Sequence, residues 1–176
     1  NIYNISLMAS VLEVAGTEGA ANWAKGVASN FARDPQSNDT GQIRAVASGE
    51  CKVSIANTYY IGRLLASGKP EDKAVIDGIR VVFPNQSDRG THVNISGAGV
   101  VASAPNKENA IKFIEYLTSD EAQRIFAEGN NEYPVIGEAT GPISTLGSFK
   151  EDQISASILG IRQKEAVEIF DQAGWL

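Results

Sequence analysis

The chain has 176 residues, of which 43% are hydrophobic and 20% are charged, a balance typical of a globular domain with a buried core. Its net charge of −6 at pH 7 argues against nucleic-acid binding, which usually needs a basic face. No apolar run approaches the ~18 residues of a membrane span. The chain opens on Asn1 directly in patterned sequence, so we expect that a leader has been removed.

The single cysteine and the single histidine limit the metal chemistry of the chain. Cys51 alone cannot form an intramolecular disulfide or a cysteine-based zinc or iron–sulfur site. Beside a strand-like run, Cys51 is expected to be a small buried residue, and His92 is expected to face solvent from a loop. If a metal binds here, oxygen atoms must hold it.

Helices dominate the first part of the chain, where apolar residues recur at helical spacing between capping residues and glycines. Asn4 is expected to cap the first helix. Asp39, with Gln42 three residues later, is expected to form a capping box at the third. The predicted helices are 5–16, 17–31, 40–49, 59–68 and 70–76, and a strand is predicted at 52–57.

Strands and helices continue to alternate further along the chain. Residues 79–84, which end at a proline, and residues 97–102 are predicted strands, and Ser119 is expected to cap a helix. The other predictions are helices at 106–119, 120–129 and 161–170, an extended segment at 130–135 and a connection at 137–153. This alternation predicts an α/β fold, and the shortage of strands relative to helices indicates part of a larger α/β protein.

Motifs that would indicate an enzyme are absent from the sequence. The run "SGAGVV" lacks the third glycine of a dinucleotide-binding loop and precedes a strand rather than a helix. A Ser-His-Asp hydrolase would have to use His92, and no nucleophile motif points to it. No calcium loop is present, and Glu71, Asp72 and Asp77 are expected on a solvated helix face.

The stretch "VSIANTYYIGRLL" places two adjacent tyrosines, Tyr59 and Tyr60, directly after the predicted strand 52–57. In one interpretation both rings pack at the edge of the core, with their hydroxyl groups wet or hydrogen-bonded. In the other, both phenolates bind a hard, highly charged cation such as ferric ion, at the strand end where ligands sit in α/β sheets. The residues alone leave both interpretations open.

The chain resembles the ferric-ion-binding periplasmic proteins of bacterial ABC iron importers, in particular their cyanobacterial branch. The "N-x-Y-Y" motif is the most specific part of this resemblance, which extends over essentially the whole chain. The resemblance implies a transferrin-like, type II periplasmic binding protein with two α/β lobes joined by a hinge. The segments that carry it are "NIYNISLMAS", "NDTGQIRAVASGE", "IANTYYIGRLL", "THVNISGAGVVASAPNKENAIKFIEYLTS" and "AQRIFAEGNNEYPV".

The resemblance implies that Tyr59 and Tyr60 bind iron through their phenolate oxygens. It also implies a third ligand, Tyr3, within the "N-I-Y-N" segment. The remaining ligands would come from the first lobe, which this chain largely lacks. Ferric ion is the expected cargo, with ferrous ion as a second candidate that an oxygen-rich site would hold less tightly.

In some members of that family an exogenous anion, such as carbonate, completes the iron site. The resemblance implies anion contacts from Asn57 and from the helix start at Asn38 and Thr40. A helix N-terminus is a reasonable anion cradle, although the neighbouring Asp39 would oppose a negative ligand there.

The expected architecture is the second lobe of a type II binding protein plus a segment that returns to the first lobe. Residues 1–89 would form most of the second lobe, residues 90–140 would return to the first, and residues 141–176 would pack on the second. The resemblance implies a periplasmic and, when intact, monomeric protein that delivers iron to a permease in the inner membrane.

Two other functions are weighed against iron delivery. The first is a type II binding protein for an oxyanion or a small organic anion, motivated by the helix start near Asp39 and by Asn57. The second is an enzyme with a catalytic tyrosine, for which the sequence offers no partner base close to the pair. We therefore expect a binding protein rather than an enzyme.

Overall fold

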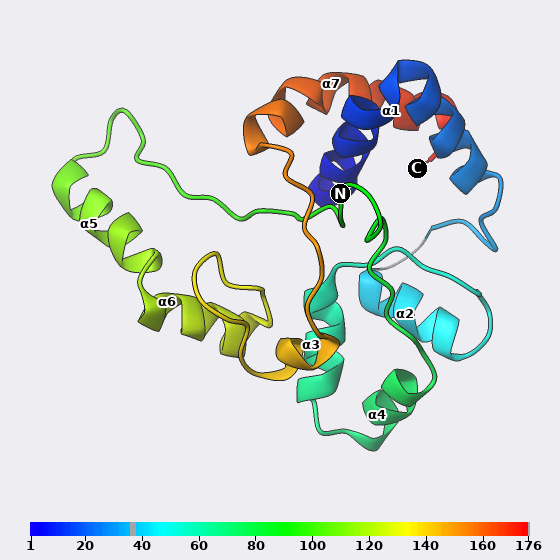
Figure 1. Cartoon of the computed structure of the whole chain (residues 1–176), viewed down its shortest axis with the longest axis horizontal. Helices are drawn as coiled ribbons and strands as arrows, with labels where there is room; N and C mark the ends of the chain where they lie inside the picture. Colours follow the sequence, from blue (N-terminus) through cyan, green and yellow to red (C-terminus); the bar gives the residue numbers. More distant parts are fainter. Residues whose placement is uncertain (36–37, 176) are drawn as a thin grey trace. The chain divides into compact units, whose positions relative to one another are not determined.

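The computed structural model describes residues 1–35 and 38–175 (Figure 1). Its α-helices are α1 (Ile2–Ala28), α2 (Asp39–Ala47), α3 (Thr58–Ala66), α4 (Pro70–Asp77), α5 (Lys107–Leu117), α6 (Asp120–Ile125) and α7 (Ala156–Ala173). A π-helical turn, η1 (Phe126–Asn130), follows α6, and a 3-10 turn, η2 (Pro142–Leu146), precedes α7. Within the described ranges, no helix is both long and apolar enough to cross a membrane.

The helix starts follow the local sequence chemistry. The side chain of Ser119 accepts a hydrogen bond from the Ala122 amide at 3.3 Å, which confirms the predicted cap of α6. The cap predicted at Asp39 is wrong by one residue, because Asn38 accepts from the Gly41 amide at 3.2 Å instead. The cap predicted at Asn4 is also wrong, since α1 already begins at Ile2.

Helix α1 contains the predicted break between two helices. Gly16 has φ 69° and ψ 174°, a left-handed backbone that glycine adopts without steric cost, and it interrupts the helical geometry. The predicted end of one helix near residue 16 is therefore confirmed. Helix α7 is longer than the predicted 161–170, because the Ser155 side chain caps it five residues earlier and accepts from the Ile158 amide at 3.4 Å.

The strands predicted at 52–57, 79–84 and 97–102 are not formed in the described part of the chain. A strand requires a neighbouring segment to satisfy its backbone amides and carbonyls, and these segments have no such ladder here. Their apolar side chains are accordingly exposed: Val53 is 82% and Val82 72% accessible to solvent. The prediction of strands at these positions is therefore wrong for this structure.

The described residues form two compact units, each taken by itself below. Unit 1 comprises the described parts of 1–35, 82–96 and 149–176, and unit 2 those of 36–81 and 97–148. The predicted assignment of the chain to two lobes concerns the intact protein and stays a prediction.

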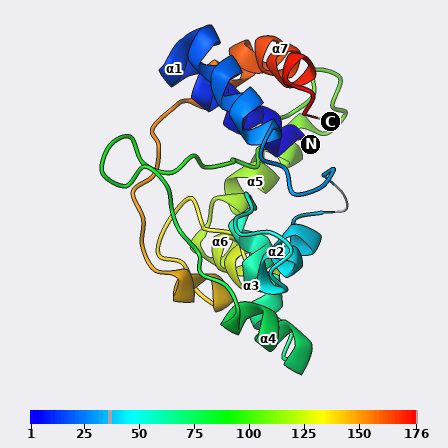
Figure 2. The ribbon, with the colours of Figure 1, turned by 90° about the vertical axis from the view of Figure 1, so that its right-hand side faces the viewer.

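The core of unit 1 forms where α1 packs on α7, which lie side by side in both views (Figures 1 and 2). Met8 and Leu12 of α1 meet Ile169 and Phe170 of α7, and small alanines let the helices approach closely. Trp175 closes the end of this core, with its ring centroid 5.7 Å from that of Trp23. Burial of these apolar side chains is the main stabilising contribution in unit 1.

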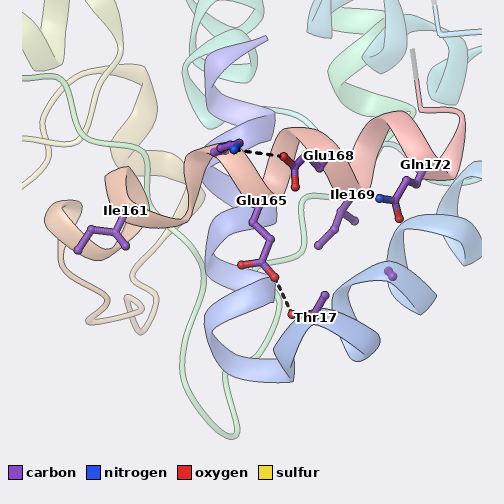
Figure 3. A pocket seen from close by; sticks show the side chains of 8 residues that line it. Thr17, Ile161, Glu165, Glu168, Ile169 and Gln172 are labelled. Carbon is purple, nitrogen blue, oxygen red and sulfur yellow. Dashed lines mark hydrogen bonds and ion pairs between the residues drawn. The ribbon is translucent and has the colours of Figure 1, made fainter.

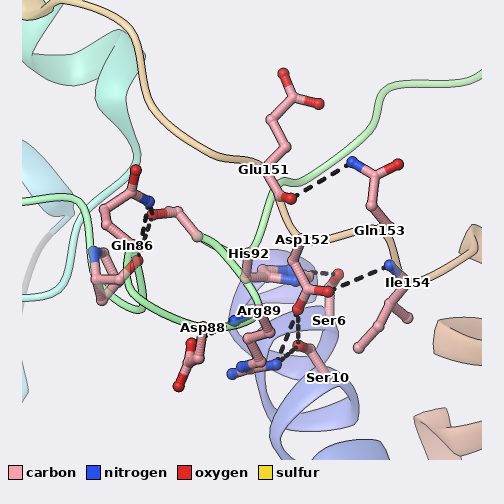
Figure 4. Close-up of polar contacts among 12 residues, drawn as sticks. Ser6, Ser10, Gln86, Asp88, Arg89, His92, Glu151, Asp152, Gln153 and Ile154 are labelled. Carbon is pink, nitrogen blue, oxygen red and sulfur yellow. Dashed lines mark hydrogen bonds and ion pairs between the residues drawn. The ribbon is translucent and has the colours of Figure 1, made fainter.

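A buried polar cluster joins three distant stretches of unit 1 (Figure 4). Arg89 donates from Nη1 to Asp152 Oδ2 at 2.9 Å and to Ser10 Oγ at 2.7 Å, and Ser10 donates to the same carboxylate oxygen at 3.2 Å. Ser10 is fully buried and Asp152 nearly so. Beside this cluster, Thr91 and Glu151 form an isolated parallel β-bridge.

His92 does not face solvent as predicted, because its ring is half-buried and hydrogen-bonded. Its Nε2 lies 3.0 Å from the hydroxyl of Ser6 on α1 (Figure 4). Burial lowers the pKa of His92 below its usual value, with Arg89 acting in the same direction, while Asn94 and the charge of Asp152 oppose the shift.

We expect His92 to make unit 1 less stable as the pH falls. The folded pKa lies below the unfolded value of ~6.5, so the unfolded chain binds the proton more readily and stability is lost as the pH drops through that value. Urea unfolding between about pH 8 and about pH 5 measures this loss, and His92→Gln should remove that part of it. If the free energy of unfolding differs between variant and parent by the same amount at every pH, the prediction is contradicted.

Unit 2 is built around α2, α3 and α4, which contribute Ile43, Ile61, Leu64 and Val75 to one core. An ion pair between Arg44 of α2 and Asp72 of α4 lies at the edge of this core. Asp72 is only 5% exposed, so the prediction that it lies on a solvated helix face is wrong.

The same prediction for two neighbouring acidic residues is confirmed, because Glu71 and Asp77 are exposed. Asp77 pairs with Lys73 at 2.6 Å on the surface of α4. The prediction that Cys51 is buried is only partly met, since its side chain is partly accessible.

Candidate metal centre

The two adjacent tyrosines occupy the first turn of α3. Asn57 precedes the helix with an extended backbone, at φ −75° and ψ 143°, and Thr58 begins it. The rings of Tyr59 and Tyr60 lie against each other, with centroids 4.3 Å apart and planes inclined by 31°. Both side chains are half-buried, so part of each remains accessible to solvent.

Arg63 lies beside both phenol rings. It follows the tyrosines by four and three residues, which places it on the same face of α3. Its guanidinium carbon lies 5.1 Å from the ring centroid of Tyr59 and 5.3 Å from that of Tyr60, within the range of a cation–π interaction. No motif pointed to Arg63, although its spacing from the two tyrosines could have indicated it.

The carboxylate of Asp39 lies at the start of α3. Asp39 Oδ2 accepts a hydrogen bond from the Asn57 amide at 2.8 Å and lies 3.4 Å from the Asn57 side-chain nitrogen. Asp39 is 8% exposed and begins α2, so its carboxylate connects the starts of two helices. A fixed negative charge at a helix N-terminus is electrostatically favourable.

The pKa of Tyr59 is raised to about 12 from its ordinary value of 10.0. Burial is the largest cause, and the neighbouring phenol of Tyr60 and the charge of Asp39 add to it, whereas Arg63 acts in the opposite direction. Tyr59 is therefore a neutral phenol at physiological pH in the metal-free protein. A strongly acidic cation would have to displace its proton.

The other predicted site residues are placed as follows. Asn38 uses its side-chain oxygen to cap α2, and Thr40 is half-buried in the first turn of that helix. Tyr3 lies on α1, in the other unit, and its hydroxyl accepts a hydrogen bond from the Asn1 side chain at 3.0 Å. The structure thus brings together Tyr59, Tyr60 and Asn57, and the role of Tyr3 stays a prediction.

Other features of the described residues do not compete with the tyrosine pair as a metal site. Over the ranges 1–35 and 38–175, no three His, Cys, Asp or Glu side chains gather in a metal-binding arrangement. Figure 3 shows an open hollow between α1 and α7, where Thr17 donates to Glu165 at 2.6 Å. Its lining includes Lys164 beside Glu168 and no tyrosine.

Comparison with known proteins places this arrangement in a family. The profile of the family described as bacterial extracellular solute-binding protein matches residues 2–145. The chain belongs to this family. The match extends over α1 to η2 and therefore includes the tyrosine pair.

Individual relatives within the family are iron proteins by name. Iron uptake protein A1 of Synechocystis sp. is 51% identical over 99% of this chain and 49% of the relative. The solved structure of the Trichodesmium protein IdiA (FutA), in complex with iron and citrate, has a TM-score of 0.94 and 54% identity over 100% of this chain and 56% of that one. The ferric binding protein from Campylobacter jejuni is 41% identical, with a TM-score of 0.90 over 98% of this chain and 55% of its own.

These similarities confirm the predicted fold class, that of a type II periplasmic binding protein. The chain spans about half the length of the relatives that it matches. Residues 52–57 and 79–84 form no ladder of backbone hydrogen bonds. This agrees with a chain that covers about half of its relatives' length, because the strands of a sheet pair with segments from several parts of a fold.

Proposed function

We propose that this chain supplies tyrosinate ligands to a ferric-ion site and that the intact protein delivers the ion to an ABC importer in the inner membrane. The observation that carries the proposal is the adjacent pair of phenols, Tyr59 and Tyr60, whose rings are in tilted contact at the start of α3 beside Arg63. Relatives over the same residues are named iron uptake and ferric binding proteins. The family description, bacterial extracellular solute-binding protein, supports the proposed periplasmic location.

The donor set suits ferric ion better than softer metals. Phenolate oxygen is a hard, anionic ligand, and the described residues around Tyr59 and Tyr60 offer no cluster of histidine, cysteine or carboxylate that would favour zinc or copper. Arg63 lies over both rings, so it stabilises phenolates once they form. Ferrous ion, with its lower charge, would gain less from the same oxygens.

We propose Tyr3 as a third ligand, on the resemblance of "NIYN" to the iron-binding family. An exogenous anion at Asn57, Asn38 and Thr40 is a weaker proposal. Asn38 already caps α2, and the Asp39 carboxylate already accepts from the Asn57 amide. Carbonate would meet a resident negative charge at this position.

The contact between the Asp39 carboxylate and the Asn57 amide also weakens the alternative function, which is the binding of an oxyanion or a small organic anion. An anion at the start of α3 would lie against the buried carboxylate of Asp39, which already takes the Asn57 amide as donor. We therefore place this function second. We propose no catalytic role for the tyrosines.

Addition of ferric citrate to the intact protein should produce a visible tyrosinate-to-iron absorption band and release protons. Because the pKa of Tyr59 is about 12, its phenol must lose a proton when it binds the ion at any lower pH. Apparent affinity should thus rise with pH, by about tenfold per unit for each phenol displaced. Indicator dye in a weakly buffered solution counts the protons.

The matched comparison is Tyr59→Phe, which should release about one proton fewer than the parent protein under the same conditions. Proton uptake by the citrate is the same for both proteins and cancels in the difference. An intact protein that stays colourless with ferric ion would sink the iron proposal. One whose thermal stability rises with phosphate or citrate and not with iron would favour the anion-binding alternative.

A further inference from the structure

Gly62 of α3 and Asn131 lie so close together that only glycine fits at position 62 while Asn131 is in place. An ideal Cβ added at Gly62 would lie 2.9 Å from Asn131 Cγ and closer still to Asn131 Cβ, within unit 2. Both residues are buried. The absent side chain of Gly62 therefore makes the space that Asn131 occupies.

This contact lies on the face of α3 that carries the first tyrosine. Gly62 follows Tyr59 by three residues, and residues three apart share one face of a helix. Cβ atoms of a helix point toward its N-terminus, so the atoms that fill the space over Gly62 lie toward the turn of Tyr59. Asn131 thus packs against the face of α3 that Gly62 shares with Tyr59.

The backbone at Asn131 is unusual in two respects. It is left-handed, at φ 61° and ψ 39°, which is uncommon for a residue other than glycine. It ends the π-helical turn η1, where the Asn131 amide donates to the Phe126 carbonyl. π-Helical turns inside or at the end of α-helices occur frequently at functional sites.

The side chain of Asn131 is held where its own polar group is not satisfied. It is 4% exposed, and its Oδ1 has no hydrogen-bond partner among the residues that the structure describes. Burial of an unsatisfied acceptor destabilises a fold, so the surroundings must hold this residue in place. Nearby, Gln123 accepts from the Val135 amide at 2.8 Å and donates to the Leu117 carbonyl at 2.7 Å, which ties the segment after η1 to α6.

The opposite constraint on α3 comes from the core of unit 2. Ile61 and Leu64 are buried against α2 and α4, so α3 cannot move away from Asn131 without disturbing that core. The helix is therefore fixed between a hydrophobic core and a rigid polar residue. Displacement of either contact would shift the phenol oxygens of the tyrosine pair.

We propose that Asn131 is a positioning residue for the tyrosine pair, acting through its contact with Gly62 of α3. The inference rests on the proposed function, because its consequence is the geometry of a ferric site. Asn131 does not contact the ion in this proposal. It sets where α3 begins and thereby how the two phenolates face a shared cation.

The test compares three variants of the intact protein, loaded with ferric citrate. Gly62→Ala should lower ferric affinity by about ten- to a hundredfold and shift the visible band, since supports of metal ligands typically contribute this much to affinity. Gly62→Ala combined with Asn131→Gly should restore both, because glycine removes the clashing Cβ and adopts the left-handed backbone readily. Gly160→Ala, at an open position of α7, should change neither.

Fluorine NMR of metal-free, fluorotyrosine-labelled protein gives a second readout that does not depend on iron. The resonances of Tyr59 and Tyr60 should move in Gly62→Ala and return in the double variant. Unchanged resonances and affinity in folded Gly62→Ala, or a double variant that stays impaired, would overturn the positioning role. If the parent protein binds no ferric ion while the resonances still move and return, the iron proposal fails and the packing role of Asn131 stands alone, which overturns its role in a metal site.

Discussion

Replacement of Tyr59 or Tyr60 by phenylalanine should weaken and shift the visible band of the ferric protein, because one tyrosinate is lost, and should lower ferric affinity by at least about a hundredfold. Loss of an outer-shell support costs up to about that factor, and a direct ligand should cost no less. Each change removes one hydroxyl from a half-buried ring, so the tilted ring contact at 4.3 Å should persist and the fold should remain intact. Chelator competition with ferric citrate measures the affinity.

The matched control is Tyr116→Phe, which removes the same hydroxyl from an exposed ring on α5. It should leave the band and the affinity unchanged. Circular dichroism and urea unfolding should show the same fold for all three variants. An unchanged band and an unchanged affinity in both Tyr59→Phe and Tyr60→Phe would show that the pair packs at the edge of the core, which is the first interpretation of the sequence.

Replacement of Asp152 by alanine should destabilise unit 1 by about 1–3 kcal/mol, because it removes the partner of the partly buried charge of Arg89 and leaves a buried hydroxyl without its acceptor. Arg89 donates to the Asp152 carboxylate at 2.9 Å, and Ser10, which is fully buried, would lose its acceptor as well. The free energy of unfolding, measured in urea, is the direct readout.

Two comparison variants distinguish the loss of this cluster from the loss of an exposed ion pair. Asp77→Ala removes an aspartate from the exposed pair with Lys73 and should change the unfolding free energy by less than about 1 kcal/mol. Arg89→Met combined with Asp152→Leu, which removes both charges, should recover much of the loss, since an apolar pair of similar volume is often neutral. Equal effects of Asp152→Ala and Asp77→Ala would contradict the importance of the cluster.

Local chemistry in the sequence determined the features that were predicted correctly. The Ser119 cap, the break at Gly16 and the limits of α4 depend on residues within one turn of each other. The β-branched residues Val53 and Ile55 favoured a strand at 52–57, which the structure does not form. Formation of a strand, however, depends on pairing with segments far away in the sequence. The alternation of predicted strands and helices does not show whether such partner segments are present.

The candidate site also combines features that the sequence indicates with one that it does not. Adjacency of Tyr59 and Tyr60 and the hardness of phenolate oxygen make a ferric site a reasonable hypothesis from the amino-acid sequence alone. Arg63 could have been found from its spacing of three and four residues. The contact of Gly62 with Asn131 could not, because it joins segments some seventy residues apart through a left-handed backbone that no local pattern requires.

Ser10 and Asp152 are 142 residues apart, and α1 packs on α7 across a similar separation. During synthesis, α1 leaves the ribosome long before its partner exists, so the apolar face with Met8 and Leu12 has nothing from unit 1 to cover it. Closing so long a loop is also entropically slow, which delays the folding of unit 1 relative to unit 2. An export pathway that acts on unfolded chains would therefore find the first helix of this chain still accessible until α7 has been made.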